Sequence, residues 1–184
     1  MFLVKAGEVY RSFAAKGGQK VVLRASRWED LDDLLDLINS VVEEGVMIVR
    51  DRLATREEEA DWLGRTLANM EKGNELHLVA EVGGAVVGSC SLSRRFGCRS
   101  HTGDLGIVIK KGFRNVGIGT EMIKTLVEEA RRMGLKVLTL GVFATNEMAL
   151  HVYRKVGFRE VGRIPKEFCR DGRYVDHIVM ALEL

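Results

Sequence analysis

The segment Arg114-Asn115-Val116-Gly117-Ile118-Gly119 joins two predicted elements of opposite type, and the rest of the chain is organised around it. The run Leu105 to Ile109 before it is apolar and β-branched, which predicts a buried strand. After it, apolar residues keep helical spacing until Gly134, which predicts a helix. Glycines let a ligand approach the backbone, and the unpaired amides at a helix start attract anions. The junction therefore predicts a cradle for a phosphate or pyrophosphate.

Two phosphate loops do not fit this junction. Gly112 and Gly117 match the first part of the Walker pattern G-x-x-x-x-G-K-[ST], but Ile118 and Gly119 stand where Lys and Ser or Thr are needed. The dinucleotide fingerprint G-x-G-x-x-G opens a βαβ unit, whereas the order here is G-x-x-x-x-G-x-G, late in the chain. The pattern R-x-x-G-x-G after a strand remains.

Outward from this turn, the spacing of apolar residues predicts a mixed sheet with helices on its faces, an α/β or α+β domain. Ser26 is expected to cap a helix over 28–43, and Thr55 a helix over 56–71. The pair Gly83-Gly84 predicts a hairpin. The expected strands are 21–25, 76–82, 85–92, 103–110, 136–143, 158–162 and 174–184, with a short helix over 146–156 and a turn at 170–173.

The 184 residues are enough for one well-filled core. We expect a single domain over 21–184 and an N-terminal extension over 1–20, joined by the glycine-bearing segment 16–19. The chain is 46% apolar and 29% charged, which is typical of a soluble globular protein. Its net charge of +2 gives no support for a direct nucleic-acid partner.

The three cysteines, Cys90, Cys98 and Cys169, show no paired metal spacing. This pattern favours a reducing compartment without disulfides and without a structural metal. The first residues lack the features of a signal peptide, and no apolar run is long enough to span a membrane. We therefore expect a cytoplasmic location and no membrane partner.

The motifs together resemble those of the GCN5-related N-acetyltransferase (GNAT) superfamily, whose hallmark is (Q/R)-x-x-G-x-(G/A) after a strand. The strand 105–109, the turn Arg114 to Gly119 and the segment Asn146 to Phe158 follow in that family's order and spacing. The resemblance runs from about Val21 to the C-terminus. It implies the GNAT fold, a mixed, mostly antiparallel sheet of about seven strands flanked by about four helices. It also implies an acetyl-CoA-dependent N-acetyltransferase that needs no metal.

The resemblance assigns the coenzyme A contacts to three places. The backbone of Ile107, Val108 and Ile109 is expected to pair with the pantetheine arm, as an added strand would. The turn is expected to hold the pyrophosphate, through Arg114, Asn115, Val116, Gly117, Ile118, Gly119 and Thr120. Asn146 matches the family's pantetheine-contacting position, although an Asn before a helix also serves as its cap.

Tyr153 lies seven residues after Asn146, about two helical turns, so both project from one face. The family uses a tyrosine here to protonate the departing thiolate. A phenol with a reference pKa of about 10 can do so only when it is close to the sulfur. The alternative is a core aromatic with a satisfied hydroxyl.

The general base is less well defined. Enzymes of the RimI type place a glutamate where this chain has Gly141. Another branch carries an acid on the strand before the turn, where Asp104 stands; its alternative role is a hydrogen-bonded residue at the strand start. His101 is a second candidate, with an exposed loop position as its alternative. The resemblance implies direct transfer in a ternary complex, with Asp104 as base and Tyr153 as acid.

The acceptor is expected to be a primary amine, with a protein lysine or N-terminus favoured over a small amine such as an amino acid, a polyamine or an antibiotic. The terminal pattern G-x-Y-x-D-x-x-x-M from Gly172 to Met180 is similar to that of archaeal and bacterial protein or small-amine acetyltransferases. Acidic residues in the 43–52 loop could attract a cation. A non-catalytic acyl-CoA sensor is the alternative function, and either a monomer or a homodimer is compatible with the sequence.

Overall fold

The protein was analysed as a computed structural model that describes residues 4–45, 48–170 and 172–184. An eight-stranded sheet runs in the order β1-β2-β3-β4-β5-β6-β8-β7, and all its neighbours are antiparallel except β5 and β6. The strands are β1 (Val9–Ala14), β2 (Lys20–Ala25), β3 (Glu75–Val82), β4 (Ala85–Arg94), β5 (Thr102–Ile109), β6 (Val137–Phe143), β7 (Arg159–Arg170) and β8 (Arg173–Glu183). The expected GNAT-type fold is confirmed, with one strand more than predicted.

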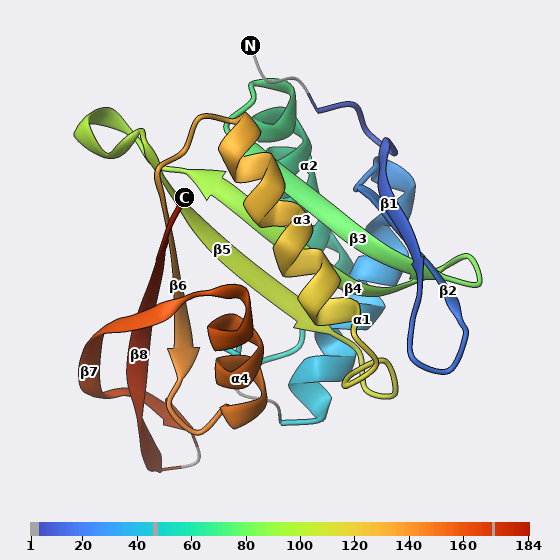
Figure 1. The fold of residues 1–184 in the computed structure, drawn as a ribbon. Helices are drawn as coiled ribbons and strands as arrows, with labels where there is room; N and C mark the ends of the chain where they lie inside the picture. The colour runs from blue at the N-terminus through green and yellow to red at the C-terminus, as the bar shows by residue number, and fades with distance from the viewer. Residues whose placement is uncertain (1–3, 46–47, 171) are drawn as a thin grey trace.

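Four α-helices cover the sheet: α1 (Leu31–Glu43), α2 (Arg56–Glu71), α3 (Ile118–Arg132) and α4 (Glu147–Val156). Helices α3 and α4 lie on one face of the sheet, and α1 and α2 lie on the other (Figure 1). The larger core cluster fills the α3 side, and a smaller cluster around Leu34, Leu63 and Val79 fills the α1 and α2 side. The sheet therefore has a packed layer on each face.

Local chemistry explains most of the helix ends. The Thr55 hydroxyl accepts from the Glu58 amide and the Glu58 carboxylate accepts from the Thr55 amide, each at 3.2 Å, so α2 begins with a capping box. Gly157 ends α4 in the left-handed conformation at φ 111°. Both boundaries agree with the sequence prediction.

The start of the first helix differs from the prediction. A 3₁₀ turn, Trp28–Asp30, precedes α1, and the Ser26 hydroxyl donates to the sulfur of Met70 instead of capping a helix. The Asp30 carboxylate accepts from the Arg27 amide and receives two hydrogen bonds from the Arg24 guanidinium, at 2.7 and 2.8 Å. A buried ion pair therefore sets this boundary, which sequence spacing alone does not reveal.

Two terminal elements extend beyond their predicted ranges. Residues 9–14, within the predicted N-terminal extension, form β1, which pairs with β2 at the edge of the sheet. Strand β7 continues to Arg170 through a register shift between Ile164 and Phe168, where Lys166 adopts a positive φ of 57°. The turn predicted at 170–173 includes Asp171, which is outside the described residues.

Candidate active site

The only parallel pair of the described sheet opens into a groove. Strands β5 and β6 pair through Thr102–Asp104 and Val137–Thr139 and then separate (Figure 1). The space between them, here called the β5–β6 groove, has a volume of about 970 Å³. Its walls include 105–109 of β5, 141–143 of β6 and one side of α4 from Met148 to Lys155. One edge of β5 is thus left without a strand partner, as an extended ligand requires.

The turn after β5 lies at one end of this groove. Asn115 and Gly117 have positive φ values of 61° and 96°, and Gly117 is the N-cap of α3 without a side-chain cap. The first intrahelical bond runs from the Glu121 amide to the Gly117 carbonyl, so the amides of residues 118–120 have no intrahelical partner. These amides and the helix dipole fit a pyrophosphate.

Two residues of the turn contribute through their backbone alone. Ile118 is 1% exposed and packs in the core, so its amide is the part that can face a ligand. A Cβ built on Gly119 would lie 3.0 Å from Cδ1 of Ile109, which leaves little room for any larger residue. The other predicted turn residues, together with 107–109 of β5, line the groove.

Arg114 also lines the groove but has protein partners. Its Nε donates to the Ile109 carbonyl at 2.8 Å, and its two terminal nitrogens donate to the Glu44 carboxylate at 2.7 Å each. The side chain therefore ties the turn to the end of α1. On the other side, the amide of Lys16 donates to the Val116 carbonyl at 2.9 Å, so the β1–β2 hairpin also braces the turn.

Asn146 and Tyr153 both line the groove from α4. The Asn146 side-chain oxygen accepts from the Ala149 amide at 3.1 Å, which leaves the amide nitrogen for a ligand, so the cap and the binding role are compatible. Tyr153 is 6% exposed, and burial raises the pKa of its phenol to about 12. The phenol is therefore protonated at neutral pH, as a proton donor must be.

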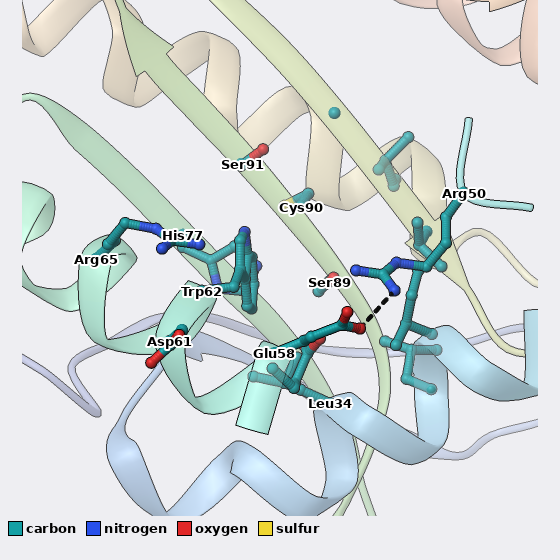
Figure 2. Close-up of a pocket in the computed structure, with 16 residues that line it drawn as sticks. Leu34, Arg50, Glu58, Asp61, Trp62, Arg65, His77, Ser89, Cys90 and Ser91 are labelled. Carbon is teal, nitrogen blue, oxygen red and sulfur yellow. Dashed lines mark hydrogen bonds and ion pairs between the residues drawn. The ribbon is translucent and has the colours of Figure 1, made fainter. Parts of the chain in front are cut away.

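A second cavity, here called the α1–α2 cavity, lies on the opposite face of the sheet and has a volume of about 500 Å³. Helices α1 and α2 form its walls, and Ser89 and Ser91 of β4 lie on its floor (Figure 2). Residues 106–108 of β5 line both the cavity and the β5–β6 groove. A molecule in the cavity and another in the groove would therefore meet at this part of β5.

Charges of both signs line the α1–α2 cavity. Figure 2 shows the Arg50 guanidinium and the Glu58 carboxylate pointing toward each other, at 3.4 Å. The stronger partner of Glu58 is Arg52, at 2.6 Å, and these contacts lower the Glu58 pKa to about 2. Among the described residues, Arg50 thus has one long ionic contact. Burial raises the pKa of the neighbouring Glu59 carboxyl.

His77 of β3 is a buried polar side chain in this cavity. It is 2% exposed, its Nδ1 has no hydrogen-bond partner among the described residues, and the Trp62 ring packs edge-on against it at 5.1 Å. Burial lowers the His77 pKa to about 4, so the imidazole is neutral at pH 7. The sequence did not point to this cavity, because its residues come from α1, α2, β3 and β4 without a common spacing.

The two predicted bases lie outside both cavities. The Asp104 carboxylate receives two hydrogen bonds from Arg95, at 2.5 and 2.6 Å, and one from Thr139 at 2.6 Å. Despite desolvation, these partners hold its pKa below the usual value. His101 is exposed at the start of β5, with its carbonyl bonded to the Lys136 amide. The geometry favours a structural role for Asp104 and brings neither residue to the groove.

The position of the expected RimI-type base, Gly141, lies in the groove wall. A Cβ built there would collide with Nε2 of His177 and lie 2.9 Å from its Cε1. The His177 imidazole, from β8, thus occupies this space. The sequence contained His177 within its terminal pattern but gave no signal for its position.

The profile of the acetyltransferase (GNAT) family matches residues 32–158. The chain belongs to this family. As a GNAT enzyme it uses acetyl-CoA as the acetyl donor, which supplies the activated acetyl thioester. The amides of residues 118–120, which have no intrahelical partner, and the groove between β5 and β6 fit this molecule. In the part of the chain that the structure describes, no three His, Cys, Asp or Glu side chains gather to hold a metal, and no helix could cross a membrane.

Several relatives of this GNAT protein have named acceptors. It is 27% identical to the L-amino acid N-acyltransferase MnaT of Escherichia coli over 88% of this chain and 93% of that one. It is 33% identical to the L-amino acid N-acetyltransferase AaaT of the same organism over 56% of this chain and 65% of that one. Among solved structures, a ribosomal-protein-alanine N-acetyltransferase from Brucella melitensis matches with a TM-score of 0.79 and 31% identity. The match covers 88% of this chain and 99% of that one.

Proposed function

We propose that this GNAT protein transfers the acetyl group of acetyl-CoA to the amino group of a small, amino-acid-like acceptor bound in the α1–α2 cavity. The observation that carries the proposal is the meeting of groove and cavity at residues 106–108. Donor and acceptor would approach this part of β5 from opposite faces of the sheet. Direct transfer in a ternary complex follows from that arrangement.

The size and lining of the cavity support a small acceptor. A volume of about 500 Å³ falls within the range typical of small-molecule sites, about 300–1,000 Å³. Leu34, Leu37 and Ile38 of α1 give it an apolar wall, which suits an aliphatic or thioether side chain. This acceptor replaces the protein lysine favoured by the sequence, for which the relatives reported above give no support.

Arg50 is the group best suited to hold the acceptor's carboxylate. It lines the cavity, and its long contact with Glu58 can be exchanged because Arg52 still neutralises Glu58. An arginine pairs with a carboxylate through two parallel hydrogen bonds, which also fixes the orientation of the amino group. The amine would then point toward β5.

In the groove, residues of the protein would bind the donor and supply a proton to the leaving group. The unpaired edge of β5 would align the donor, and the amides at the start of α3 would bind its phosphates. Tyr153 would give its proton to the departing sulfur, and its raised pKa keeps the phenol protonated at neutral pH until then. Asn146 would supply its free side-chain nitrogen to the pantetheine arm.

The experiment is a thiol-release assay with acetyl-CoA and matched acceptors: free L-amino acids, their decarboxylated amines, and short peptides with the same first residue. We expect release with one or more free amino acids and a KM at least tenfold higher for the matching amine. Arg50→Gln should raise the KM for the amino acid and leave that for the amine unchanged. Faster release with peptides than with any free amino acid would contradict the small-acceptor proposal.

A protein N-terminus is the second candidate acceptor. It is favoured by the 31% identity to the ribosomal-protein-alanine N-acetyltransferase. The peptides in the same assay test it directly. A non-catalytic sensor would bind acetyl-CoA and release no thiol with any acceptor.

A further inference from the structure

Where β6 forms the groove wall, the side chain of His177 packs against Gly141. Gly141 contributes no side chain, and the imidazole of His177 fills the space where one would begin. Counting two residues beyond the last β5–β6 pair on each strand places Gly106 and Gly141 at the point where the strands separate. Gly106 lines both the groove and the α1–α2 cavity. The His177 imidazole, which packs against Gly141, therefore lies next to the place where donor and acceptor would meet.

The ring of His177 is fixed by residues of β7. Its Nδ1 forms a short hydrogen bond with the Glu167 carboxylate, which leaves Nε2 directed to Gly141. The Phe168 ring packs against the imidazole at 5.1 Å and stacks on Phe143 of the groove wall at 3.8 Å. With a carboxylate on Nδ1, the free nitrogen is Nε2, in the tautomer that accepts a proton there.

The irregular part of β7 makes this contact possible. The register shift between Ile164 and Phe168 brings Glu167 to the His177 side, with Lys166 at a positive φ. The Lys166 amide donates to the Asp176 carboxylate at 3.0 Å, so the aspartate next to His177 holds the shifted backbone. Asp176 and His177, both in the terminal G-x-Y-x-D-x-x-x-M pattern, thus both contact the irregular part of β7.

We propose that His177, positioned by Glu167, is the general base that takes the proton from the acceptor amine. This inference rests on the proposed acetyl transfer. As the acceptor nitrogen bonds to the acetyl carbon, one proton passes from that nitrogen to Nε2 of His177. The carbon–sulfur bond breaks, and the sulfur takes the phenolic proton of Tyr153. The imidazolium and the phenolate then return to their starting forms by exchange with water.

Other titratable groups near the site fit this role less well. The Asp104 carboxylate is already occupied by hydrogen bonds from Arg95 and Thr139. His77 is buried on β3, and β4 lies between that strand and β5. Glu59 lies on α2, which packs chiefly against α1 and β3. His151 of α4 lines the groove but is exposed, whereas the His177 imidazole packs against Gly141 of β6.

The first test displaces the imidazole without removing it. A Cβ at Gly141 overlaps Nε2, so Gly141→Ala should lower kcat by about 10²-fold, as should His177→Ala and His177→Gln. Adding Gly141→Ala to His177→Ala should cost little more, because the clash is gone. Gly162→Ala, in open space on β7, is the matched control and should keep wild-type kcat. The dissociation constant of acetyl-CoA, from a thermal-shift titration, should stay within about threefold throughout.

The second test does not depend on turnover. With ¹⁵N-labelled histidine, the His177 ring signals are assigned by their loss in His177→Gln, and we expect them to shift when acetyl-CoA is added. Glu167→Gln should change the Nδ1/Nε2 tautomer pattern of His177 and lower kcat, with KM for acetyl-CoA preserved. A kcat within threefold of wild type in both His177 variants, or unchanged ring signals, overturns the proposal. Wild-type protein that releases no thiol with any amine instead refutes the proposed function.

Discussion

Nε2 of His177 lies where the first side-chain atom of a residue at position 141 would stand. Strand β8 pairs with β6 on the side away from β5, and it thus supplies the side chain that Gly141 of β6 lacks. The absence of a glutamate at Gly141 therefore does not leave this wall of the groove without a titratable group. The glycine is instead required, because any Cβ there would displace the imidazole.

Tyr153→Phe should lower kcat by about 10²-fold and leave the dissociation constant of acetyl-CoA nearly unchanged. The phenol is buried in the groove wall with its pKa raised to about 12, so wild-type enzyme carries the proton at every pH used in assays. Stopped-flow measurement of thiol release separates the chemical step from binding. Equal rates for the variant and the wild type would remove Tyr153 from the role of acid.

Gly119→Ala should weaken acetyl-CoA binding by about tenfold, or about 1.4 kcal/mol. The added Cβ would lie 3.0 Å from Ile109 Cδ1, so the Ile109 side chain, which lines the groove, must move by a few tenths of an ångström to accept it. Gly64→Ala in α2 is the control, because its Cβ meets Trp28 at an ordinary 3.7 Å. Isothermal titration with acetyl-CoA checks both, and equal affinities would argue against close packing of the turn on β5.

His77 should make the protein less stable as the pH falls from about 6.5 to 4. Its pKa is about 4 in the folded protein and about 6.5 when unfolded, so the unfolded chain binds the proton more tightly in this window. The loss should reach about 3 kcal/mol at pH 4 and be absent in His77→Gln. Urea unfolding of both proteins at pH 7 and pH 4 measures the difference. Parallel pH curves would contradict a buried neutral imidazole.

Asp104→Asn should lower the free energy of unfolding by about 1 kcal/mol, because the paired carboxylate is partly exposed and screened by solvent. Its pKa is held below the usual value, so this stability is present above about pH 4 and lost as the pH falls further. Asp32→Asn is the control, since Asp32 and Arg56 are both exposed. A larger loss of kcat in Asp104→Asn than in His177→Ala would return Asp104 to the role of base.

The sequence predicted the parts of the structure that depend on neighbours in the chain. The cap at Thr55, the glycine ends of the helices and the junction at Gly117 are local interactions, so spacing is enough to find them. The cofactor side of the site, from Ile107 to Tyr153, was predicted from the resemblance to the GNAT superfamily, whose motifs follow one another along the chain. Their contacts with acetyl-CoA remain predictions.

The proposed acceptor side of the site and the start of α1 depend on contacts between distant segments, which spacing does not encode. Arg24 and Asp30 set the start of α1 through a buried ion pair. His177 reaches Gly141 through the pairing of β6 and β8, and Glu167 reaches His177 through an irregular strand. Asp104 occupies an expected strand position, but its tertiary partners Arg95 and Thr139 change its chemistry. The contacts of these residues depend on the sheet order, which the spacing of residues along the chain does not reveal.

The proposed acetyl transfer is tested most directly by thiol release from acetyl-CoA in the presence of single free L-amino acids and of peptides that begin with the same residues. We predict release with a free amino acid, a higher KM for that amino acid in Arg50→Gln, and slower release with the peptides. Binding of acetyl-CoA without thiol release for every acceptor would contradict it.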